Sequence, residues 1–300
     1  GIVGNVDARS VGFGLGPRLN AAGRLGKADS GLHLLTTTDL SVAKALAQEL
    51  EQTNQERKEI QEETFLEAES LMRNEIDVDS QRVIVLASEI FHPGVIGIAA
   101  SKIVDKYHRP TVLIALEDGI GKGSGRSIPK FNLFKAFTDC SSHLIQFGGH
   151  AYAAGLSIQE ENVAAFSDAM NAVGHRHLSE EDLIPEVKID TTLDISQINF
   201  TLYKNISMLE PFGAENPVPS FQSQNIKIKE VKYIGKEKNH VRFRAVQGRG
   251  QIEVVAFNFA SIFESLDTAP EQFDIAYELH LHSWNGREKL ELRLLDIRGV

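Results

Sequence analysis

Cysteine and long apolar runs are nearly absent from this chain of 300 residues, and each absence excludes a class of protein. Because Cys140 is its one cysteine, neither an intrachain disulfide nor a metal site built from several cysteines is possible. The densest apolar stretch, Arg82–Ala87, is far shorter than the roughly 18 residues that a membrane helix needs. The chain also lacks the Gly-x-x-x-x-Gly-Lys-Ser/Thr loop of P-loop NTPases and the Gly-x-Ser-x-Gly turn of α/β-hydrolases.

The composition is globular, with 42% hydrophobic residues, and the net charge is −10. An acidic chain argues mildly against a nucleic-acid partner, because proteins that bind phosphates are usually basic. The charges are segregated, however: residues 39–79 hold twelve acids and four bases, whereas residues 225–250 hold eight bases and two acids. Since salt screens exposed charges beyond about 8 Å, the basic segment can still bind a polyanion.

Glycine and proline are missing between Leu32 and His92, and this predicts one long helix. Thr38 or Asp39 can cap its start, and it continues to about Ile76, a length of about 57 Å. Residues 51–59 contain no apolar side chain, which favours a helix that spans solvent between domains over a coiled coil. The glycine-rich block 1–31 reads as loops and short elements, too small to form a core.

Strand and helix patterns alternate over residues 77–180 and predict an α/β layer domain. The predicted strands are 82–87, 111–116 and 156–158, with a glycine-rich strand or loop at 121–128. The predicted helices are 93–107, 131–146 and 159–173, and the acidic stretch 178–184 is predicted to be a linker.

From Pro185 onward the apolar residues recur with period two, as in half-buried strands. A one-residue slip of this pattern suggests a bulge near Lys229–Glu230. Five or six such strands in about 115 residues fit a small barrel such as an OB-fold. Four basic residues fall on its outward face and suggest a track for a single strand, although an ordinary solvated face would look the same. They are Lys227, Lys229, Arg242 and Arg244.

Polar residues stand beside glycines in three clusters, an arrangement that suits phosphate contact because glycine lets backbone N–H groups approach an oxyanion. The clusters are Gly16-Pro-Arg-Leu-Asn-Ala-Ala-Gly-Arg24, Gly123-Ser-Gly-Arg-Ser127 and Phe147-Gly-Gly-His-Ala-Tyr-Ala-Ala-Gly155. His92-Pro-Gly94 is a fourth candidate, because it opens a predicted helix. Each cluster has a simpler interpretation: glycines usually mark turns, His150 alone suits a satisfied buried histidine, and Pro93 alone suits a helix start.

No spacing of histidine, aspartate and cysteine forms a convincing metal-ligand set, so no metal ligand is predicted in this chain. Cys140 falls in a predicted helix, where a packing role is favoured over a nucleophilic one.

Taken together, the clusters resemble the ordered motifs of the bacterial RecJ single-strand-specific exonucleases, which belong to the DHH phosphoesterase superfamily. The motifs are Gly14–Gly26, His92–Ile98, Ser124–Ser127 and Gly148–Gly155, followed by Leu209–Pro217 and Leu292–Arg298. The resemblance covers nearly all of the chain. The Gly148–Gly155 motif alone is less specific, because other DHHA1 domains share it, including those of alanyl-tRNA synthetases and small oligonucleotide phosphodiesterases.

The resemblance implies an α/β DHHA1-type domain plus an all-β OB-fold barrel, preceded by a long interdomain helix. It assigns residues 1–38 to the end of a DHH domain, 39–76 to the connecting helix, 77–180 to the DHHA1 domain and 185–300 to the OB-fold. It also implies a 5′-to-3′ exonuclease of DNA recombination and repair, dependent on Mn²⁺ or Mg²⁺ held by the DHH domain. No Asp-His-His or Asp-His-Asp triplet occurs here, so the chain is expected to lack most of that domain and to be inactive alone.

The resemblance also gives expected roles to site residues. Arg126 and His150 are the expected catalytic residues, with His150 near the scissile bond on the Gly148–Gly149 turn. Ser124 and Ser127 would grip phosphates, and His92 would lie near the scissile region. Arg18, Asn20 and Arg24 would line the cleft.

Single-stranded DNA is the expected partner, and a single-strand-binding protein or a helicase is a further one left open. A cytoplasmic monomer without membrane contact is expected. Two rivals remain: another DHH/DHHA1 phosphodiesterase that acts on short oligonucleotides, which usually lacks such a barrel, and a non-catalytic module that binds single strands.

Overall fold

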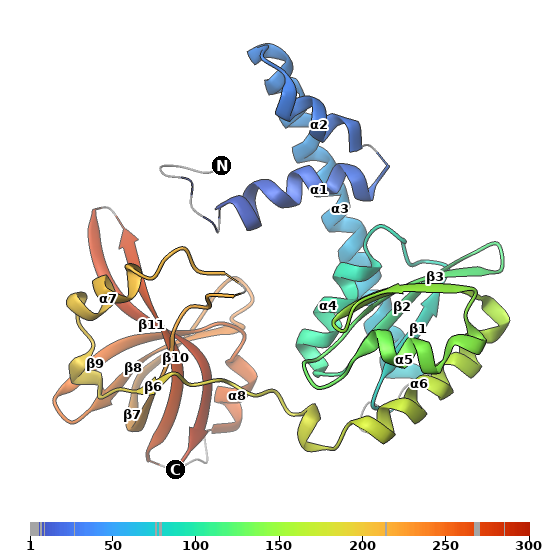
Figure 1. Ribbon diagram of the computed structural model, residues 1–300. Helices are drawn as coiled ribbons and strands as arrows, with labels where there is room; N and C mark the ends of the chain where they lie inside the picture. The colour runs from blue at the N-terminus through green and yellow to red at the C-terminus, as the bar shows by residue number, and fades with distance from the viewer. Residues whose placement is uncertain are drawn as a thin grey trace. The chain divides into compact units, whose positions relative to one another are not determined.

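The computed structural model describes residues 6, 8, 10–26, 28–75, 77, 80–213, 215–266, 271–284 and 286–300 (Figure 1). The chain divides into two compact units, with the boundary between Pro185 and Glu186. Within the described residues, no helix combines the length and the apolar character needed to cross a membrane.

The described part of the glycine-rich block contains the predicted short elements, but they are helices and leave less loop than expected. A π-helical turn, Ser10–Leu15, leads into α1, Gly16–Arg24, and α2 covers Ala28–Thr36. Pro17 in the first turn of α1 suits a helix start, because its missing N–H would have no partner there. The buried side chains of α1 are Ala21 and Ala22, which are small enough for close packing on the next helix.

The predicted long helix is confirmed as α3, Leu40–Glu75, with 36 residues. Asp39 caps its start, since its Oδ1 accepts the N–H groups of Ser41 at 2.7 Å and Val42 at 3.2 Å. The Ser41 hydroxyl also donates to this carboxylate. That bond, followed by the two backbone bonds, lowers the pKa of Asp39.

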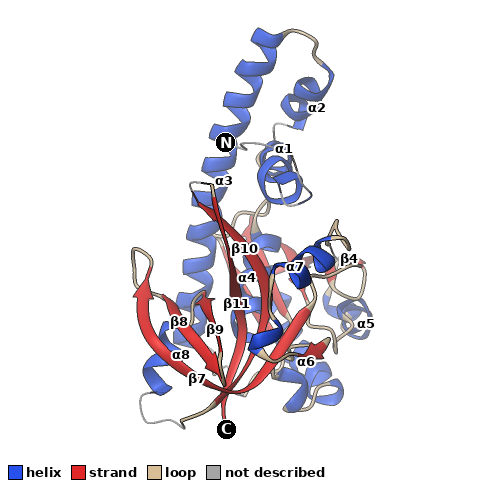
Figure 2. Cartoon of the chain, turned by 90° about the vertical axis from the view of Figure 1, so that its left-hand side faces the viewer, coloured by secondary structure: helices blue, strands red, loops and turns tan. Residues whose placement is uncertain are grey.

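The polar middle of α3 does not span open solvent, contrary to prediction. Four of its polar side chains are buried, and in the ribbon views α1 crosses α3 while α2 lies nearer the start of that helix (Figures 1 and 2). These side chains are Thr53, Asn54, Arg57 and Gln61.

The C-terminal part of α3 packs on a five-stranded sheet with strand order β1-β2-β3-β5-β4. Its strands are β1 (Ile84–Ser88), β2 (Thr111–Glu117), β3 (Ile120–Arg126), β4 (Gln146–Gly149) and β5 (Ala153–Gln159). The first two are parallel and the others pair antiparallel. α4, Ile96–Tyr107, shares a hydrophobic core with α3 on one face.

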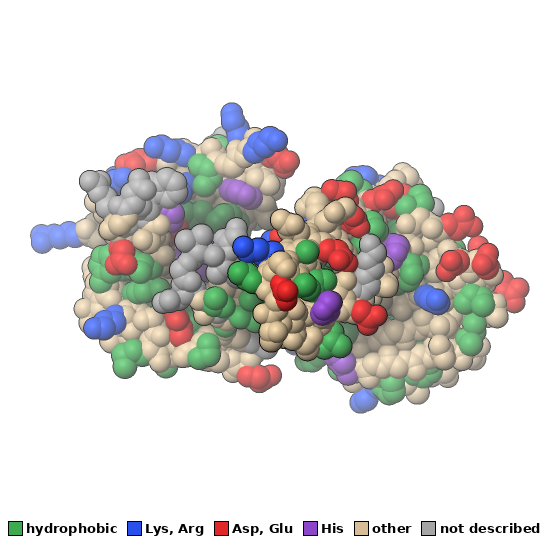
Figure 3. All heavy atoms as spheres, turned by 90° about the horizontal axis from the view of Figure 1, so that it is seen from above, with side chains coloured by type: hydrophobic (Ala, Val, Ile, Leu, Met, Phe, Trp, Pro, Cys, Tyr) green, Lys and Arg blue, Asp and Glu red, His purple; other side chains and the backbone are tan. Residues whose placement is uncertain are grey.

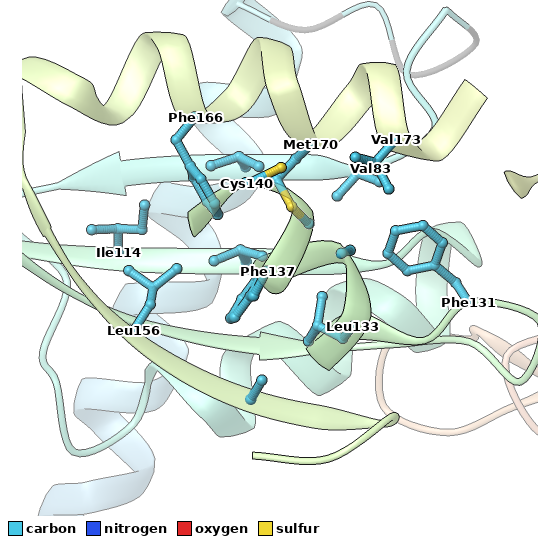
Figure 4. Close-up of a cluster of buried hydrophobic side chains, with 14 of the residues drawn as sticks. Val83, Ile114, Phe131, Leu133, Phe137, Cys140, Leu156, Phe166, Met170 and Val173 are labelled. Carbon is cyan, nitrogen blue, oxygen red and sulfur yellow. The ribbon is translucent and has the colours of Figure 1, made fainter. Parts of the chain in front are cut away.

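The other face of the sheet carries the larger core (Figure 4). There α5, Leu133–Asp139, and α6, Val163–His177, pack Phe137 and Phe166 edge to face at 5.8 Å. Cys140 lies in this core, where burial raises the pKa of its thiol to about 11, in agreement with the predicted packing role.

Two predicted boundaries in this unit were wrong. The helix predicted over 131–146 ends at Asp139, because a 3-10 turn, Ser141–His143, and strand β4 follow. The stretch 178–184 is not a linker, because Leu178 and Leu183 are buried in the same core.

The C-terminal unit is a closed barrel, which confirms the OB-type prediction (Figure 2). Its strands are β7 (Ser220–Ile234), β8 (His240–Gln247), β9 (Gly250–Ala256), β10 (Phe273–Trp284) and β11 (Arg287–Gly299). β10 pairs with both β11 and β7 and so closes the sheet. The short strand β6 (Thr191–Thr192) pairs in parallel with β7, and two helices, α7 (Phe200–Ser207) and α8 (Ala260–Ser265), lie in the connections.

The predicted bulge is present, because the β7–β8 register shifts between Lys229 and Lys232 and Glu230 has a φ of +55°. Inside the barrel, Tyr277 and Ser223 join their hydroxyl groups at 2.8 Å. Burial raises the pKa of Tyr277 to about 12, so this phenol stays neutral.

Candidate nucleic-acid interface

Strand β3 alternates glycines with polar residues, and this alternation directs its polar side chains to one face. Gly121, Gly123 and Gly125 face the larger core; a Cβ at Gly125 would lie 2.6 Å from Leu133 Cδ2. Because side chains alternate along a strand, Ser124 and Arg126 project from the opposite face, toward α4.

Ser124 and Arg126 lie directly over the first turn of α4. A Cβ at Gly97 would be 2.7 Å from Arg126 Nη2 and 2.8 Å from Ser124 Oγ, so any other residue at this position would displace them. Arg126 Nη1 donates to Ser124 Oγ at 3.2 Å and to the Gly125 carbonyl at 2.8 Å. At this helix end the N–H groups of Ile96, Ile98 and Ala99 already donate to the carbonyls of His92 and Val95, but the helix dipole still favours an anion there.

Arg24 reaches the same helix end from α1. Its Nη1 donates to the Gly94 carbonyl at 3.1 Å, just before α4 begins. The Gly94 N–H donates to His92 Nδ1 at 3.0 Å, which leaves the ring proton of a neutral His92 on Nε2. We call Arg24, His92, Ser124 and Arg126 the α4 cluster.

The α4 cluster carries positive charge without a matching negative one. Burial, and then the charge of Arg24, lower the pKa of Arg126. Within the described residues, no carboxylate forms an ion pair with Arg24 or Arg126, although other arginines of this unit are paired. Two guanidinium groups, a hydroxyl and a helix N-terminus together suit a phosphate, which guanidinium binds in bidentate geometry.

Gly148 and Gly149 end the edge strand β4, and His150 follows in the connection to β5, so the predicted Gly-Gly turn is strand. Gly149 has a φ of +144°, and a Cβ there would lie 2.5 Å from the Ala154 backbone, so this position requires glycine. His150 is exposed, and its Nδ1 accepts from the Tyr152 N–H at 3.3 Å. It lines a hollow with residues of α5 and α6, and none of the hydrogen bonds or ion pairs of the described residues joins it to Arg126. Its role near a scissile bond stays a prediction.

Three other residues expected in the site make different contacts. Ser127 Oγ donates to the Phe131 carbonyl at 2.7 Å. Arg18 pairs with Glu51 of α3 at 2.5 Å and donates to the Gly14 carbonyl at 2.7 Å. Asn20 is exposed on α1. None of these contacts brings them to the α4 cluster, and their predicted roles stay untested.

The four basic residues predicted as a track on the barrel divide into two kinds. Lys227 and Lys229 of β7 are exposed, and neither forms an ion pair within the described part of the chain. Arg242 pairs with Glu253 at 3.4 Å, and Arg244 pairs with Glu230 at 2.8 Å. On the surface seen in Figure 3, basic side chains are likewise separated by acidic and neutral ones.

The sequence analysis missed one buried basic residue, Arg57 of α3, which is 9% exposed. The available signal was its spacing from Asn54 and Gln61, which puts all three on one helix face. Its acid-rich surroundings in the sequence hid that signal.

No metal-ligand set occurs among the described residues: no three histidine, cysteine, aspartate or glutamate side chains group closely enough to hold an ion. The residues described therefore do not fit the divalent metal that the resemblance implies.

Two family models match this chain: the DHHA1 domain over residues 80–175 and the RecJ OB domain over residues 189–296. The single-stranded-DNA-specific exonuclease RecJ of Bacillus subtilis is 36% identical over 298 residues, which cover 99% of this chain and 38% of that protein. RecJ of Haemophilus influenzae is 35% identical over 291 residues, which cover 94% of this chain and 50% of that protein. The chain thus spans about half the length, or less, of these curated relatives.

The crystal structure of Thermus thermophilus RecJ in complex with Mn²⁺ matches with a TM-score of 0.84 and 30% identity, over 98% of this chain and 42% of that one. The structure of the same protein with Mg²⁺ has a TM-score of 0.82. Both the barrel and the layered sheet lie within this match. The chain therefore carries a DHHA1 domain and the OB domain of RecJ, and it is similar to RecJ exonucleases over nearly its whole length.

Proposed function

We propose that this chain is the substrate-binding part of a single-stranded-DNA-specific 5′-to-3′ exonuclease of the RecJ type. The observation that carries the proposal is the α4 cluster: Arg24, Ser124 and Arg126 converge on a helix N-terminus without a carboxylate to neutralise them. A backbone phosphate of DNA is the anion that this family's substrate would bring.

The cluster's groups suit different parts of a phosphate. The two guanidinium groups can each donate two parallel hydrogen bonds, and the Ser124 hydroxyl can donate to a remaining oxygen. Arg126 is already held by Ser124 and the Gly125 carbonyl, so its guanidinium needs little reordering when the phosphate binds. Neutral His92 can donate from Nε2.

Mn²⁺ or Mg²⁺ would supply phosphate polarisation in the complete enzyme. Because the described residues offer no ligand set, we place the metal ligands in the part of the relatives that this chain does not span. On this view the chain alone binds single-stranded DNA but does not cleave it. Lys227 and Lys229 would contact the strand along the barrel.

The first experiment replaces Arg126 with alanine in a protein of the relatives' full length. Loss of a charge-assisted phosphate contact should cost at least about 1.5 kcal/mol, or roughly tenfold in kcat/KM on a 5′-phosphorylated single strand. Arg176→Ala, which removes an exposed arginine of α6, is the matched control and should leave kcat/KM unchanged. Unchanged turnover by Arg126→Ala would remove Arg126 from the site.

The second experiment incubates the chain alone with Mn²⁺ and end-labelled single-stranded DNA. We expect binding that weakens with salt, and no cleavage. Efficient cleavage would show that the metal ligands lie in this chain. Binding without any contribution to cleavage in the full-length protein would instead favour the non-catalytic module.

Several expectations from the resemblance extend this proposal. We propose that the protein is a cytoplasmic monomer. We also propose that a single-strand-binding protein or a helicase is its partner. Light scattering of the purified chain tests the monomeric state. The rival short-oligonucleotide phosphodiesterase is disfavoured by the barrel, and it would show higher turnover on dinucleotides than on long strands.

A further inference from the structure

Arg57 of the N-terminal unit is buried and forms no ion pair among the residues that the structure describes. Arg57 donates from Nη1 to Gln61 Oε1 at 2.5 Å and from Nη2 to Asn54 Oδ1 at 2.7 Å. Both acceptors are neutral amides, and no carboxylate of a described residue forms an ion pair with Arg57. Because Arg57 is a buried residue, its charge is costly unless a counter-charge accompanies it, so this arrangement suits an anion that arrives from outside.

Arg57 is electrostatically connected to the α4 cluster through Arg24. Burial, and then the charge of Arg24, lower the pKa of Arg57, and the same two causes act on Arg126. Arg24 therefore lies close enough to influence both. Three arginines share one region whose like charges repel one another, and a bound phosphate would relieve that repulsion.

The alignment of α3 and α4 supports the same placement. Two ion pairs show that the helices run side by side in the same direction: Lys102–Glu62 at 2.8 Å and Lys106–Glu69. From the first pair, five residues back along each helix, about 7.5 Å, lead to Gly97 on α4 and Arg57 on α3. Gly97 is the residue on which Arg126 and Ser124 lie.

We propose that Arg57 is a positioning residue of the α4 cluster: its buried charge raises the affinity of Arg24 and Arg126 for a DNA phosphate. The phosphate in turn supplies the counter-charge that Arg57 lacks. This inference rests on the proposed function, because it needs a phosphate at the α4 cluster. A purely structural alternative is that Arg57 only joins Asn54 and Gln61 within α3.

Gln61→Glu separates the two readings. The substitution keeps the size of the side chain and the oxygen that accepts from Arg57, but it gives Arg57 a permanent counter-charge. If Arg57 attracts phosphate, the variant should bind a 5′-phosphorylated thymidine dinucleotide about fivefold more weakly, while its Tm without ligand holds or rises. If Arg57 is purely structural, the affinity should not change.

The controls use the same helix and the same probe. Gln48→Glu adds one negative charge on the exposed side of α3 and should leave affinity unchanged. Arg57→Gln should weaken binding about as much as Gln61→Glu, and Arg57→Lys should restore affinity to within about twofold of the unsubstituted chain, because it restores the charge. Calorimetry measures the affinities, and thermal unfolding without ligand measures the Tm.

Three outcomes are decisive. Weaker binding by Gln61→Glu at unchanged or higher Tm, with recovery in Arg57→Lys, supports the proposal. Equal affinity of Gln61→Glu and Gln48→Glu, while Arg126→Gln loses binding, overturns the role of Arg57 and leaves the proposed function standing. Failure of the unsubstituted chain to distinguish the phosphorylated from the unphosphorylated dinucleotide overturns the phosphate site itself, and the role of Arg57 with it.

Discussion

The two units use arginine in opposite ways. In the N-terminal unit, Arg24 and Arg126 converge on α4 and no described carboxylate pairs with them. In the barrel, Arg242 and Arg244 face outward and each pairs with a glutamate of a neighbouring strand. The first arrangement leaves charge available for a ligand, whereas the second uses it within the fold.

Net charge along the sequence therefore misjudges both places. Residues 225–250 are the most basic segment, yet two of their arginines are neutralised locally. Residues 39–79 are strongly acidic, yet they contain the buried Arg57. What decides whether a charge can bind DNA is its pairing in three dimensions, and the following substitutions test that difference.

The largest effect should come from comparing two arginines of α1. Arg24→Gln removes an unpaired charge from the α4 cluster and should weaken binding of a 5′-phosphorylated single strand about tenfold or more. Arg18→Gln removes a charge that Glu51 already neutralises and should change the affinity by less than about twofold. Equal losses, measured by fluorescence anisotropy, would erase the distinction between paired and unpaired arginines.

A smaller effect is expected from adding one methyl group beneath the cluster. Gly97→Ala would place its Cβ against Arg126 Nη2 and Ser124 Oγ, and both side chains can move away. The fold should survive, while phosphate affinity falls about fivefold because the two groups lose their alignment. Gly148→Ala, where a Cβ meets nothing within 4 Å, is the control. Full affinity in Gly97→Ala would show that this alignment is unimportant.

In the barrel, lysine and arginine should differ. Lys229→Gln removes an unpaired charge and should weaken single-strand binding about threefold, with the slope of log K against log salt reduced by about 0.7. Arg244→Gln, directly across the strand pair, removes a charge that Glu230 neutralises and should have a smaller effect. A larger loss in Arg244→Gln would mean that DNA displaces Glu230.

The smallest effect should be a gain. Glu230→Gln frees Arg244, so single-strand affinity should rise by about twofold. Glu237→Gln, in the β7–β8 connection, also removes one negative charge. Among the described residues Glu237 pairs with no arginine, so this variant frees none. If both variants gain equally, the benefit is general charge and not the release of Arg244.

Local pattern predicted most of the fold. Period-two apolar residues around Val241 and Leu292 gave the barrel strands, and the absence of glycine and proline gave α3. The helices at 16–24 and 28–36 were missed because Gly16, Gly23 and Gly31 indicate turns. Packing of α1 and α2 on α3 outweighs that local preference, and packing between distant segments is invisible to a local pattern.

The site was only partly predictable for the same reason. The glycines beside Ser124 and Arg126 indicated these two residues, and the structure brings them to the same helix end as Arg24. The spacing of Arg57 from Asn54 and Gln61 indicated a shared helix face, but not that this face is buried, because its burial depends on helices packed against α3. The pairing of Arg244 with Glu230 was equally hidden, because the bulge at Glu230 sets which side chains face each other.

The row of glycines in β3 has a consequence for how tightly a ligand can be held. Core side chains sit within 3 Å of where each Cβ of Gly121, Gly123 and Gly125 would be, so the strand backbone is clamped at three alternate residues. Ser124 lies between two of these tightly packed glycines, and Arg126 directly follows the last of them. Much of the conformational entropy that a flexible loop would lose when it closes on DNA is thus already lost when this domain folds.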